Sequence, residues 1–368
     1  MKKLIIFFLL FIFYSGNVYS QTSNSELITS FDKLTDSIIA NTNVPGLIVG
    51  VWDNIKEFLW ITAKGKADIK NNIPMSSDML FRIGSITKTF TITVLLQLAD
   101  EKKISLDDKL SIYFPEFPKS DSVTIAMLCN MSSGIFDFAE TEEFQKSFNT
   151  NPQKVWTAEE QINLALSKPF YFPVGTSFHY SNTNTIIIGM IIEKVTGRKV
   201  SVEIKERIID KLGLKHTYYA NGRFLEGDYC HGYAALPDSA TGLQKDLTDE
   251  IDISWIGSAG AMVSNIFDLN IYVEALTDGL LISPETQKKR LEFIEVPGLP
   301  YAKYGIGIFS YNGFLGHNGY IPGYNSIMLR HPQKDCTIIM FYNVQSKNPV
   351  NELAIDFIKL LYPEVWKE

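Results

Sequence analysis

The most constraining feature of this 368-residue sequence is the stretch 81–98, in which the run FRIGSITKT leads into a segment that is apolar nearly all round a helix. Such a segment predicts a buried central helix. Ser85 and Lys88 are three residues apart where a turn enters that helix, so their hydroxyl and amine would share one helical face. Ser85 would also lie at the helix N-terminus, where unpaired N–H groups favour developing negative charge. The stretch therefore predicts a nucleophilic serine.

The spacing Ser-x-x-Lys is not specific by itself. Ser30 and Lys33 have the same spacing, but they fall within an ordinary amphipathic helical pattern with no strand or turn before it. We therefore interpret Ser30 as a surface position and retain Ser85 as the candidate nucleophile.

The order of the expected elements indicates an α/β (α+β) fold. Strand patterns occur near both ends of the chain, at 46–52, 57–62, 304–311, 314–317, 324–331 and 336–343. Residues 105–249 are mostly helical in pattern, and a last helix is expected at 349–361. The simplest architecture is a mostly antiparallel central sheet flanked by helices, formed by 21–104 and 250–368, with 105–249 inserted as a mostly helical domain. The crevice between the two parts is the expected active site.

The N-terminus has the three-part layout of a secretory signal. Two lysines precede the apolar run 4–13, and small residues occupy the −1 and −3 positions for cleavage between Ser20 and Gln21. The apolar run is short for a membrane span. We expect residues 1–20 to be a signal peptide and the mature protein to be periplasmic or secreted, without a stable span. An uncleaved N-terminal anchor is the alternative.

Charge and cysteine content exclude several classes of protein. The formal charge is −7, and loss of the two leader lysines lowers it to −9, which argues against a nucleic-acid partner. Cys129, Cys230 and Cys336 allow at most one disulfide and form no zinc pattern, so we interpret them as small buried side chains. The histidines are not spaced as metal ligands. We expect neither a metal nor another cofactor.

A second candidate motif is Tyr180-x-Asn182, in a loop just before a helix expected at 185–195. A phenol near a lysine ammonium can take part in proton transfer. The amide of Asn182 can orient such a network or hold a substrate amide. Tyr219 and Asn221 repeat the spacing, but they follow a helix end and lack a comparable setting. The alternative for Tyr180 is a packed aromatic side chain.

A third candidate motif is His317-x-Gly319, at the end of a late strand pattern. His317 is the one histidine of five that lies between glycines at a strand edge, where backbone can approach a ligand closely. No Gly-x-Ser-x-Gly elbow surrounds Ser85, which argues against an α/β-hydrolase triad.

Together the three motifs resemble the serine β-lactamase and penicillin-binding superfamily. The similarity is greatest to the branch that holds class C β-lactamases and D-alanyl-D-alanine carboxypeptidases, in which Tyr-x-Asn and then Lys-Thr-Gly or His-x-Gly follow Ser-x-x-Lys. It covers nearly the whole mature chain and includes the segments 81–88, 172–176, 257–264, 316–319 and 322–324. It implies a β-lactamase/transpeptidase-like fold.

The resemblance implies catalytic roles. Ser85 would be the acylated nucleophile, Lys88 would help to remove its proton, and Tyr180 would relay protons to and from the leaving group. Whether Lys88 or Tyr180 is the general base stays open. The backbone N–H groups of Ser85 and Tyr320 would form the oxyanion hole.

The resemblance also implies substrate-binding residues, and here the sequence departs from the pattern. Asn182, His317, Asn318 and Gly319 would bind substrate. His317 replaces the lysine typical of β-lactamases, so carboxylate binding would be weaker or pH-dependent, because histidine is largely neutral above pH ~6.5. Asn318 replaces a hydroxyl residue that would contact the same carboxylate. Met131 occupies the histidine position of the family's Leu-Leu-x-His-Thr-Ser-Gly.

These observations support three hypotheses. The first is an exported serine hydrolase acting on a small peptide, amide or β-lactam through an acyl-enzyme, with D-alanyl-D-alanine-type peptides as leading substrates. The second is an esterase that uses the same residues, since the pocket chooses the leaving group. The third is a catalytically silent protein that binds the cell wall, with peptidoglycan as partner, or acts as a sensor. It predicts a lost motif residue, and all three motifs are intact.

Overall fold

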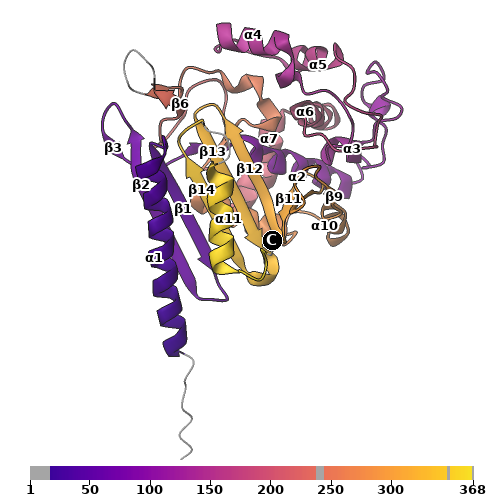
Figure 1. Cartoon of the computed structure of the whole chain (residues 1–368). Helices are drawn as coiled ribbons and strands as arrows, with labels where there is room; N and C mark the ends of the chain where they lie inside the picture. Colours follow the sequence, from indigo (N-terminus) through magenta and orange to yellow (C-terminus); the bar gives the residue numbers. More distant parts are fainter. Residues whose placement is uncertain (1–16, 238–243, 346–348, 367–368) are drawn as a thin grey trace, which may run out of the picture.

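The structure is a computed structural model that describes residues 17–237, 244–345 and 349–366 (Figure 1). Its centre is a nine-stranded sheet in the order β3-β2-β1-β14-β13-β12-β11-β10-β9, in which every neighbouring pair is antiparallel. Helices cover both faces of this sheet. The predicted antiparallel sheet flanked by helices is therefore confirmed.

The sheet joins the two ends of the chain, because β1 from the N-terminal part pairs with β14 from the C-terminal part. Its strands are β1 (Gly46–Asp53), β2 (Phe58–Asp68), β3 (Ile73–Pro74), β9 (Ile294–Glu295), β10 (Ala302–Tyr304), β11 (Phe309–Tyr311), β12 (Phe314–Ile321), β13 (Tyr324–His331) and β14 (Cys336–Tyr342). A second, three-stranded sheet has the order β4 (Phe81–Arg82), β8 (Met262–Ser264), β5 (Tyr218–Tyr219). A third sheet consists of β6 (Tyr233–Pro237) and β7 (Gln244–Asp246).

The helices fall into three groups. On one face of the sheet lie α1 (Asn17–Asn41) and α11 (Pro349–Leu361) (Figure 1). On the other lie α2 (Thr87–Asp100) and α9 (Ile266–Thr277), and α10 (Pro284–Arg290) packs against these two helices. A third group stands beyond α2 and consists of α3 (Ile125–Cys129), α4 (Glu142–Thr150), α5 (Ala158–Leu166), α6 (Asn182–Thr196), α7 (Val200–Ile204) and α8 (Asp210–Leu212), with a π-helical turn at Lys205–Ile209 between the last two.

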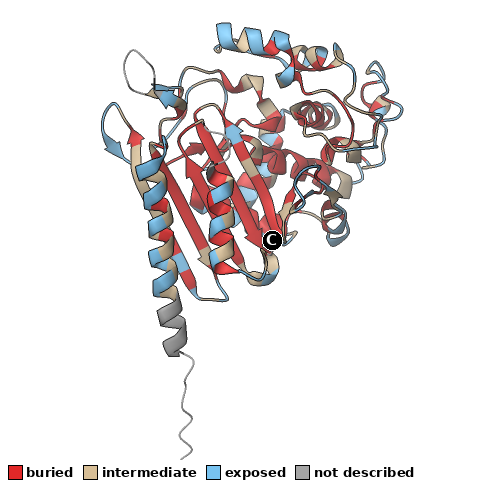
Figure 2. Ribbon diagram, in the orientation of Figure 1, coloured by how far each residue is buried: buried red, intermediate tan, exposed pale blue. Residues whose placement is uncertain are grey.

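Besides a minor apolar cluster around Tyr304 and Phe309, this layering gives two large apolar cores, and the central strands between them are buried throughout (Figure 2). The smaller core lies between the sheet and the pair α1 and α11. The larger core runs from the other face through α2 into α6 and the helices around it. Because this core is continuous, the division of the chain at 105–249 stays a prediction.

Helix α2 is the central buried helix that the sequence predicts. Every side chain from Thr87 to Leu98 is buried. The predicted leader, in contrast, falls mostly on residues 1–16, outside the described residues, and 17–20 form the start of α1. No helix in the described part of the chain is both long and apolar enough to cross a membrane.

Candidate active site

Ser85 lies in a short 3-10 turn (Gly84–Ile86) between β4 and α2, where it is half-buried. Strand β12 packs closely against this turn. Gly84 has φ +51°, and a Cβ there would lie 3.0 Å from the Tyr320 nitrogen, while a Cβ on Gly319 would lie 2.0 Å from the Ile83 carbonyl oxygen. Only glycine allows backbone to approach so closely. The two glycines thus bring the backbone of Tyr320 beside that of Ser85, where the sequence predicts the oxyanion hole.

Lys88 projects from the first turn of α2 and is completely buried. Its Nζ lies 2.9 Å from Ser85 Oγ, 2.8 Å from Asn182 Oδ1 and 2.8 Å from the Ala259 carbonyl oxygen. Burial lowers the pKa of Lys88 to about 7, and the charge of Asp137 opposes part of that shift. At neutral pH a large fraction of Lys88 is therefore an uncharged amine beside the serine hydroxyl.

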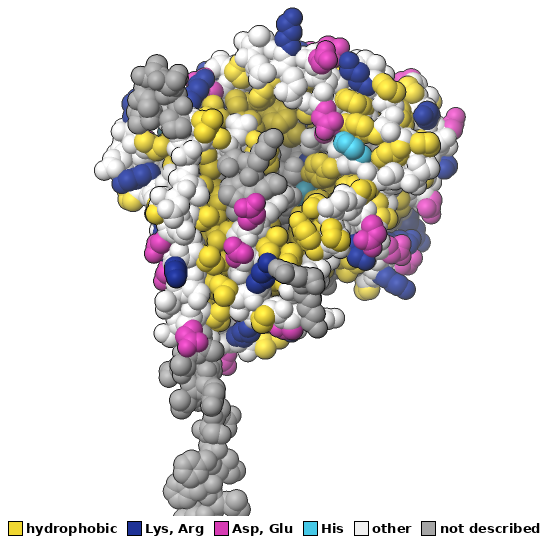
Figure 3. Space-filling model, viewed as in Figure 1, with side chains coloured by type: hydrophobic (Ala, Val, Ile, Leu, Met, Phe, Trp, Pro, Cys, Tyr) yellow, Lys and Arg dark blue, Asp and Glu magenta, His cyan; other side chains and the backbone are white. Residues whose placement is uncertain are grey.

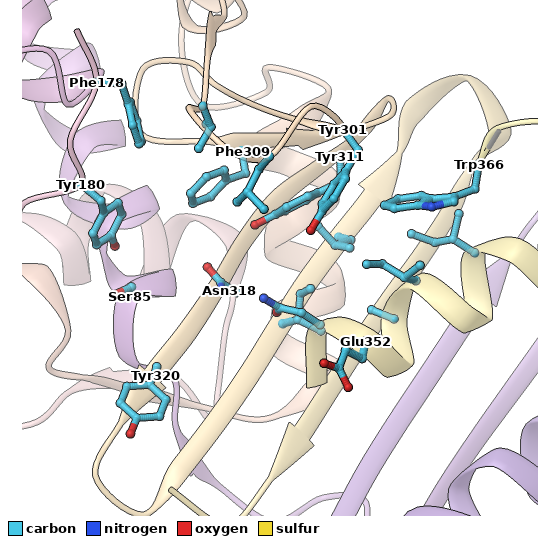
Figure 4. Close-up of a pocket in the computed structure, with 18 residues that line it drawn as sticks. Ser85, Phe178, Tyr180, Tyr301, Phe309, Tyr311, Asn318, Tyr320, Glu352 and Trp366 are labelled. Atoms are coloured by element: carbon cyan, nitrogen blue, oxygen red, sulfur yellow. The ribbon is translucent and has the colours of Figure 1, made fainter. Parts of the chain in front are cut away.

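Tyr180 faces the same two residues. Lys88 Nζ lies 4.9 Å from the centre of its ring, and the ring's hydroxyl end points toward Ser85 (Figure 4). The hydroxyl oxygen is buried and has no hydrogen bond of normal geometry to any described residue. Burial raises the pKa of Tyr180, and the nearby Ser85 hydroxyl only partly offsets this. Tyr180 is therefore a neutral phenol in the resting site.

Asn182 is the first residue of α6, three residues earlier than the sequence predicted that helix to begin. Its backbone and side-chain amides both donate to Asp137 Oδ2, at 3.0 and 2.8 Å. Asp137 is buried, and burial raises its pKa. Sequence reasoning missed Asp137 because 45 residues separate it from its partner.

His317 lies behind the site rather than in its opening. It is completely buried, and its ring centre is 6.0 Å from that of Tyr180. Its Nδ1 lies 2.6 Å from the Asn318 carbonyl oxygen and its Nε2 lies 3.2 Å from the Tyr304 hydroxyl. Burial lowers the pKa of His317 to about 3. A neutral ring with both nitrogens engaged fits the weaker carboxylate binding of the two expected alternatives, and the role of His317 in substrate binding stays a prediction.

A cavity of about 450 Å³ opens over Ser85 and Tyr180 and continues past Asn318 to Trp366 (Figure 4). The cavity extends around one edge of strand β12 that no described strand covers. Strand β11 pairs with β12 only as far as Gly316, so the segment 317–321 has no described strand on that side. Beyond this edge the cavity is lined by α11 and by residues of the smaller core, such as Leu329.

The cavity is mainly apolar and aromatic, and Figure 3 shows hydrophobic side chains gathered around the hollow beside α11. Phe309 links its two ends, with ring centres 6.4 Å from Tyr180 and 5.3 Å from Tyr311. At the far end of the cavity, the ring centres of Tyr301 and Trp366 lie 5.2 Å apart. Among the described residues that line it there is no lysine, arginine or histidine.

The remaining candidates do not join this site. Ser30 lies in α1, and Tyr219 lines a different cavity. All three cysteines are free and buried. Within the described ranges, no group of three or more His, Cys, Asp or Glu side chains is arranged to hold a metal ion.

Comparison with known proteins assigns this chain to a family. A model of the family described as Beta-lactamase matches residues 31–362, and the chain belongs to that family. Relatives include penicillin-binding protein 4* of Bacillus subtilis, 25% identical over 78% of this chain, and a D-aminopeptidase of Brucella anthropi, 29% identical over 77%. The chain spans 66% of the length of the first and 53% of the second.

Solved structures show the same fold. A D-stereospecific amidohydrolase from Streptomyces superposes with a TM-score of 0.81 at 26% identity, covering 91% of this chain and 98% of its own. A D-amino acid amidase from Ochrobactrum anthropi, in complex with D-phenylalanine, gives a TM-score of 0.79 at 26% identity, covering 92% and 99%.

Proposed function

We propose that the protein is a serine hydrolase that cleaves amide or peptide bonds through an acyl-enzyme on Ser85. The observation that carries this proposal is the buried Lys88 amine 2.9 Å from Ser85 Oγ, with a pKa lowered to about 7. A base with a pKa near the working pH is best suited to take a proton from a hydroxyl.

The three contacts of Lys88 determine where the lone pair of its amine points. An uncharged amine has two hydrogens and one lone pair. The Ala259 carbonyl and Asn182 Oδ1 carry no hydrogen, so they accept the two hydrogens. The lone pair is left for the remaining partner, the Ser85 hydroxyl. This geometry favours Lys88 over the neutral phenol of Tyr180 as the base in acylation.

The reaction then proceeds in two balanced stages. Ser85 Oγ attacks the substrate carbonyl carbon while its proton passes to Lys88 Nζ, and the carbonyl oxygen becomes an oxyanion that the N–H groups of Ser85 and Tyr320 stabilise. The C–N bond breaks, and the leaving nitrogen receives a proton that Lys88 supplies through Tyr180. Water hydrolyses the resulting ester by the same steps, which frees the acid and restores Ser85.

The cavity favours substrates without a carboxylate near the scissile bond. Its described lining has no cationic side chain, and His317 is neutral, so nothing there balances a buried carboxylate. This points to amides of the kind that the names of the D-amino acid amidase and D-aminopeptidase indicate, ahead of D-alanyl-D-alanine peptides. The same apolar lining favours small esters as a second substrate class.

Export follows from the leader alone, as a separate part of the proposal. Cleavage between Ser20 and Gln21 would release the enzyme to the periplasm or medium. N-terminal sequencing of the protein recovered from those fractions would test it, and a retained leader on membrane-bound protein would contradict it.

Turnover of D-amino acid amides and p-nitrophenyl esters tests the activity, with intact-mass detection of an acyl adduct, including one from a penicillin. Ser85→Ala should abolish both turnover and adduct. Ser30→Ala, which alters the other Ser-x-x-Lys, should leave both unchanged. The proposal fails if wild type gives no turnover and no adduct, or if Ser85→Ala matches wild type. The ratio of amide to ester kcat/KM decides between the two substrate classes.

A further inference from the structure

We propose that Asp137 is a positioning residue, which fixes the Asn182 amide so that the lone pair of Lys88 stays directed at Ser85. This inference rests on the proposed function, because it concerns the base of that reaction. Asp137 is not among the residues that line the cavity, and its side chain accepts hydrogen bonds from Asn182 and Ala139. It acts on Lys88 in two ways, through its hydrogen bond to Asn182 and through its charge.

The first step is the orientation of an amide. Asn182 Nδ2 donates to Asp137 Oδ2 at 2.8 Å, which leaves Oδ1 as the end that faces Lys88 Nζ at 2.8 Å. A carboxylate only accepts, so it holds the NH₂ end on its own side. The reversed amide would direct two oxygens at each other on one side and two nitrogen donors on the other.

The second step is the consequence of a reversed amide for the base. An NH₂ group facing Lys88 would donate to the amine lone pair and would compete with the Ser85 hydroxyl for it. With Oδ1 there instead, Asn182 takes a hydrogen from the amine and leaves the lone pair free. Asp137 thereby determines which of the three Lys88 contacts is the productive one.

The third step is charge. Asp137 is 4% exposed and Lys88 is 0% exposed, so little solvent screens one from the other. The charged and titratable groups around Asp137 are Lys88, Glu140, Tyr171 and Tyr180. Its negative charge favours the protonated amine and thus opposes the effect of burial on Lys88. Removal of that charge should lower the pKa of Lys88 further.

The anchorage of Asp137 suits this role. Its Oδ1 accepts the Ala139 N–H at 3.0 Å and caps the 3-10 turn Phe138–Glu140. One oxygen thus fixes the side chain to its own turn, and the other serves Asn182. Asp252 provides a matched comparison, because it is also buried and caps a 3-10 turn through Ser254 N at 2.9 Å, away from Lys88.

The pH profile of kcat/KM, measured with an ester substrate, tests the proposal. Asp137→Asn should move the acid limb to lower pH by about half a unit or more, since the variant loses the charge and keeps only one of the two accepting oxygens. Asp137→Ser, which keeps a capping oxygen but cannot reach Asn182, should move the limb in the same direction and lower kcat by about tenfold or more. Asp252→Asn should leave the limb where it is.

An acid limb that stays unchanged in both Asp137 variants would overturn the proposal, whatever their kcat. Circular dichroism identifies a variant that does not fold, and the other variant then carries the test. Failure of the proposed function looks different, because wild type itself would then show no Ser85-dependent turnover.

Discussion

At the scale of single residues, the site is a compromise between stability and reactivity, and Lys88 shows it most clearly. A lysine amine with three hydrogen bonds sits where no water reaches it. Burial lowers the pKa of Lys88, so that the amine is uncharged and can accept a proton near pH 7, and the same burial makes the charged form costly in the folded protein.

Lys88→Met should therefore change how stability depends on pH. In the folded protein the pKa of Lys88 is lowered to about 7, while an unfolded lysine has a pKa of about 10.4. Between these values the unfolded chain binds more protons, so the free energy of unfolding of wild type rises with pH. Relative to Lys88→Met, wild type should gain about 2 kcal/mol between pH 7 and 9.

Urea denaturation of both proteins at pH 6, 7, 8 and 9 measures this difference, in which other titrating groups cancel. Lys33→Met, an exposed lysine of α1, is the control and should show no such trend. A constant difference between wild type and Lys88→Met would mean that Lys88 keeps its charge over this range.

Residue chemistry explains which site positions the sequence could predict. Ser85, Lys88, Tyr180 and Asn182 come together as expected, because each belongs to a short motif with a recognisable local setting. Asp137 has no such motif, since its partner is remote in sequence. His317 was found by its glycine neighbours, but nothing in the sequence indicates that its ring turns into the core.

At the scale of elements, the sequence predicted the bounds of a helix or strand best where glycine or proline marks its ends. Strand β13 (Tyr324–His331) and helix α11 (Pro349–Leu361) have the expected bounds, because glycine and proline stand at their ends. The run expected at 304–311 is instead two strands, β10 and β11, joined by a tight turn at Gly307 with φ +70°. Alternating patterns continue across a short hairpin, so periodicity alone cannot reveal the reversal.

Helix α6 positions the site through a second contact besides Asn182. Gly189 faces Ser258, and a Cβ there would lie 2.6 Å from Ser258 Oγ and 2.8 Å from its Cβ. The residue after Ser258 is Ala259, whose carbonyl oxygen accepts from Lys88. The glycine therefore lets α6 approach the segment that holds the amine.

Gly189→Ala should destabilise the protein by about 1–3 kcal/mol through overpacking, although alanine is the better helix former by about 1 kcal/mol. It should also lower kcat, because Ser258 must shift and Ala259 with it. Thermal unfolding and steady-state kinetics measure the two effects. Adding Ser258→Gly should restore much of both; stability at or above the wild-type value in Gly189→Ala alone would show that the contact relaxes freely.

At the scale of the whole molecule, the sheet separates two large cores, and the proposed nucleophile and base, Ser85 and Lys88, lie on the side of the larger one. Phe90 of α2 stacks on Tyr272 of α9 with ring centres 3.6 Å apart, in the larger core. Phe31 of α1 stacks on Phe357 of α11 at 3.9 Å, in the smaller core. Both Phe90 and Phe31 are completely buried, so they form a matched pair.

Phe31→Ala and Phe90→Ala should each cost about 3–5 kcal/mol of stability, the usual cost of removing a buried phenylalanine ring. Their effects on kcat should differ. Phe90 lies two residues after Lys88 on the same helix, so a cavity there lets the amine move, and a small displacement of a catalytic group costs up to about a hundredfold in rate. Phe31 is separated from Ser85 by the sheet, so the folded fraction of Phe31→Ala should turn over at the wild-type rate. Kinetics at a temperature where both variants are folded, with active sites counted by acylation of Ser85, measures the contrast. An equal loss of kcat in the two variants would show that the sheet transmits packing changes between its faces instead of isolating them.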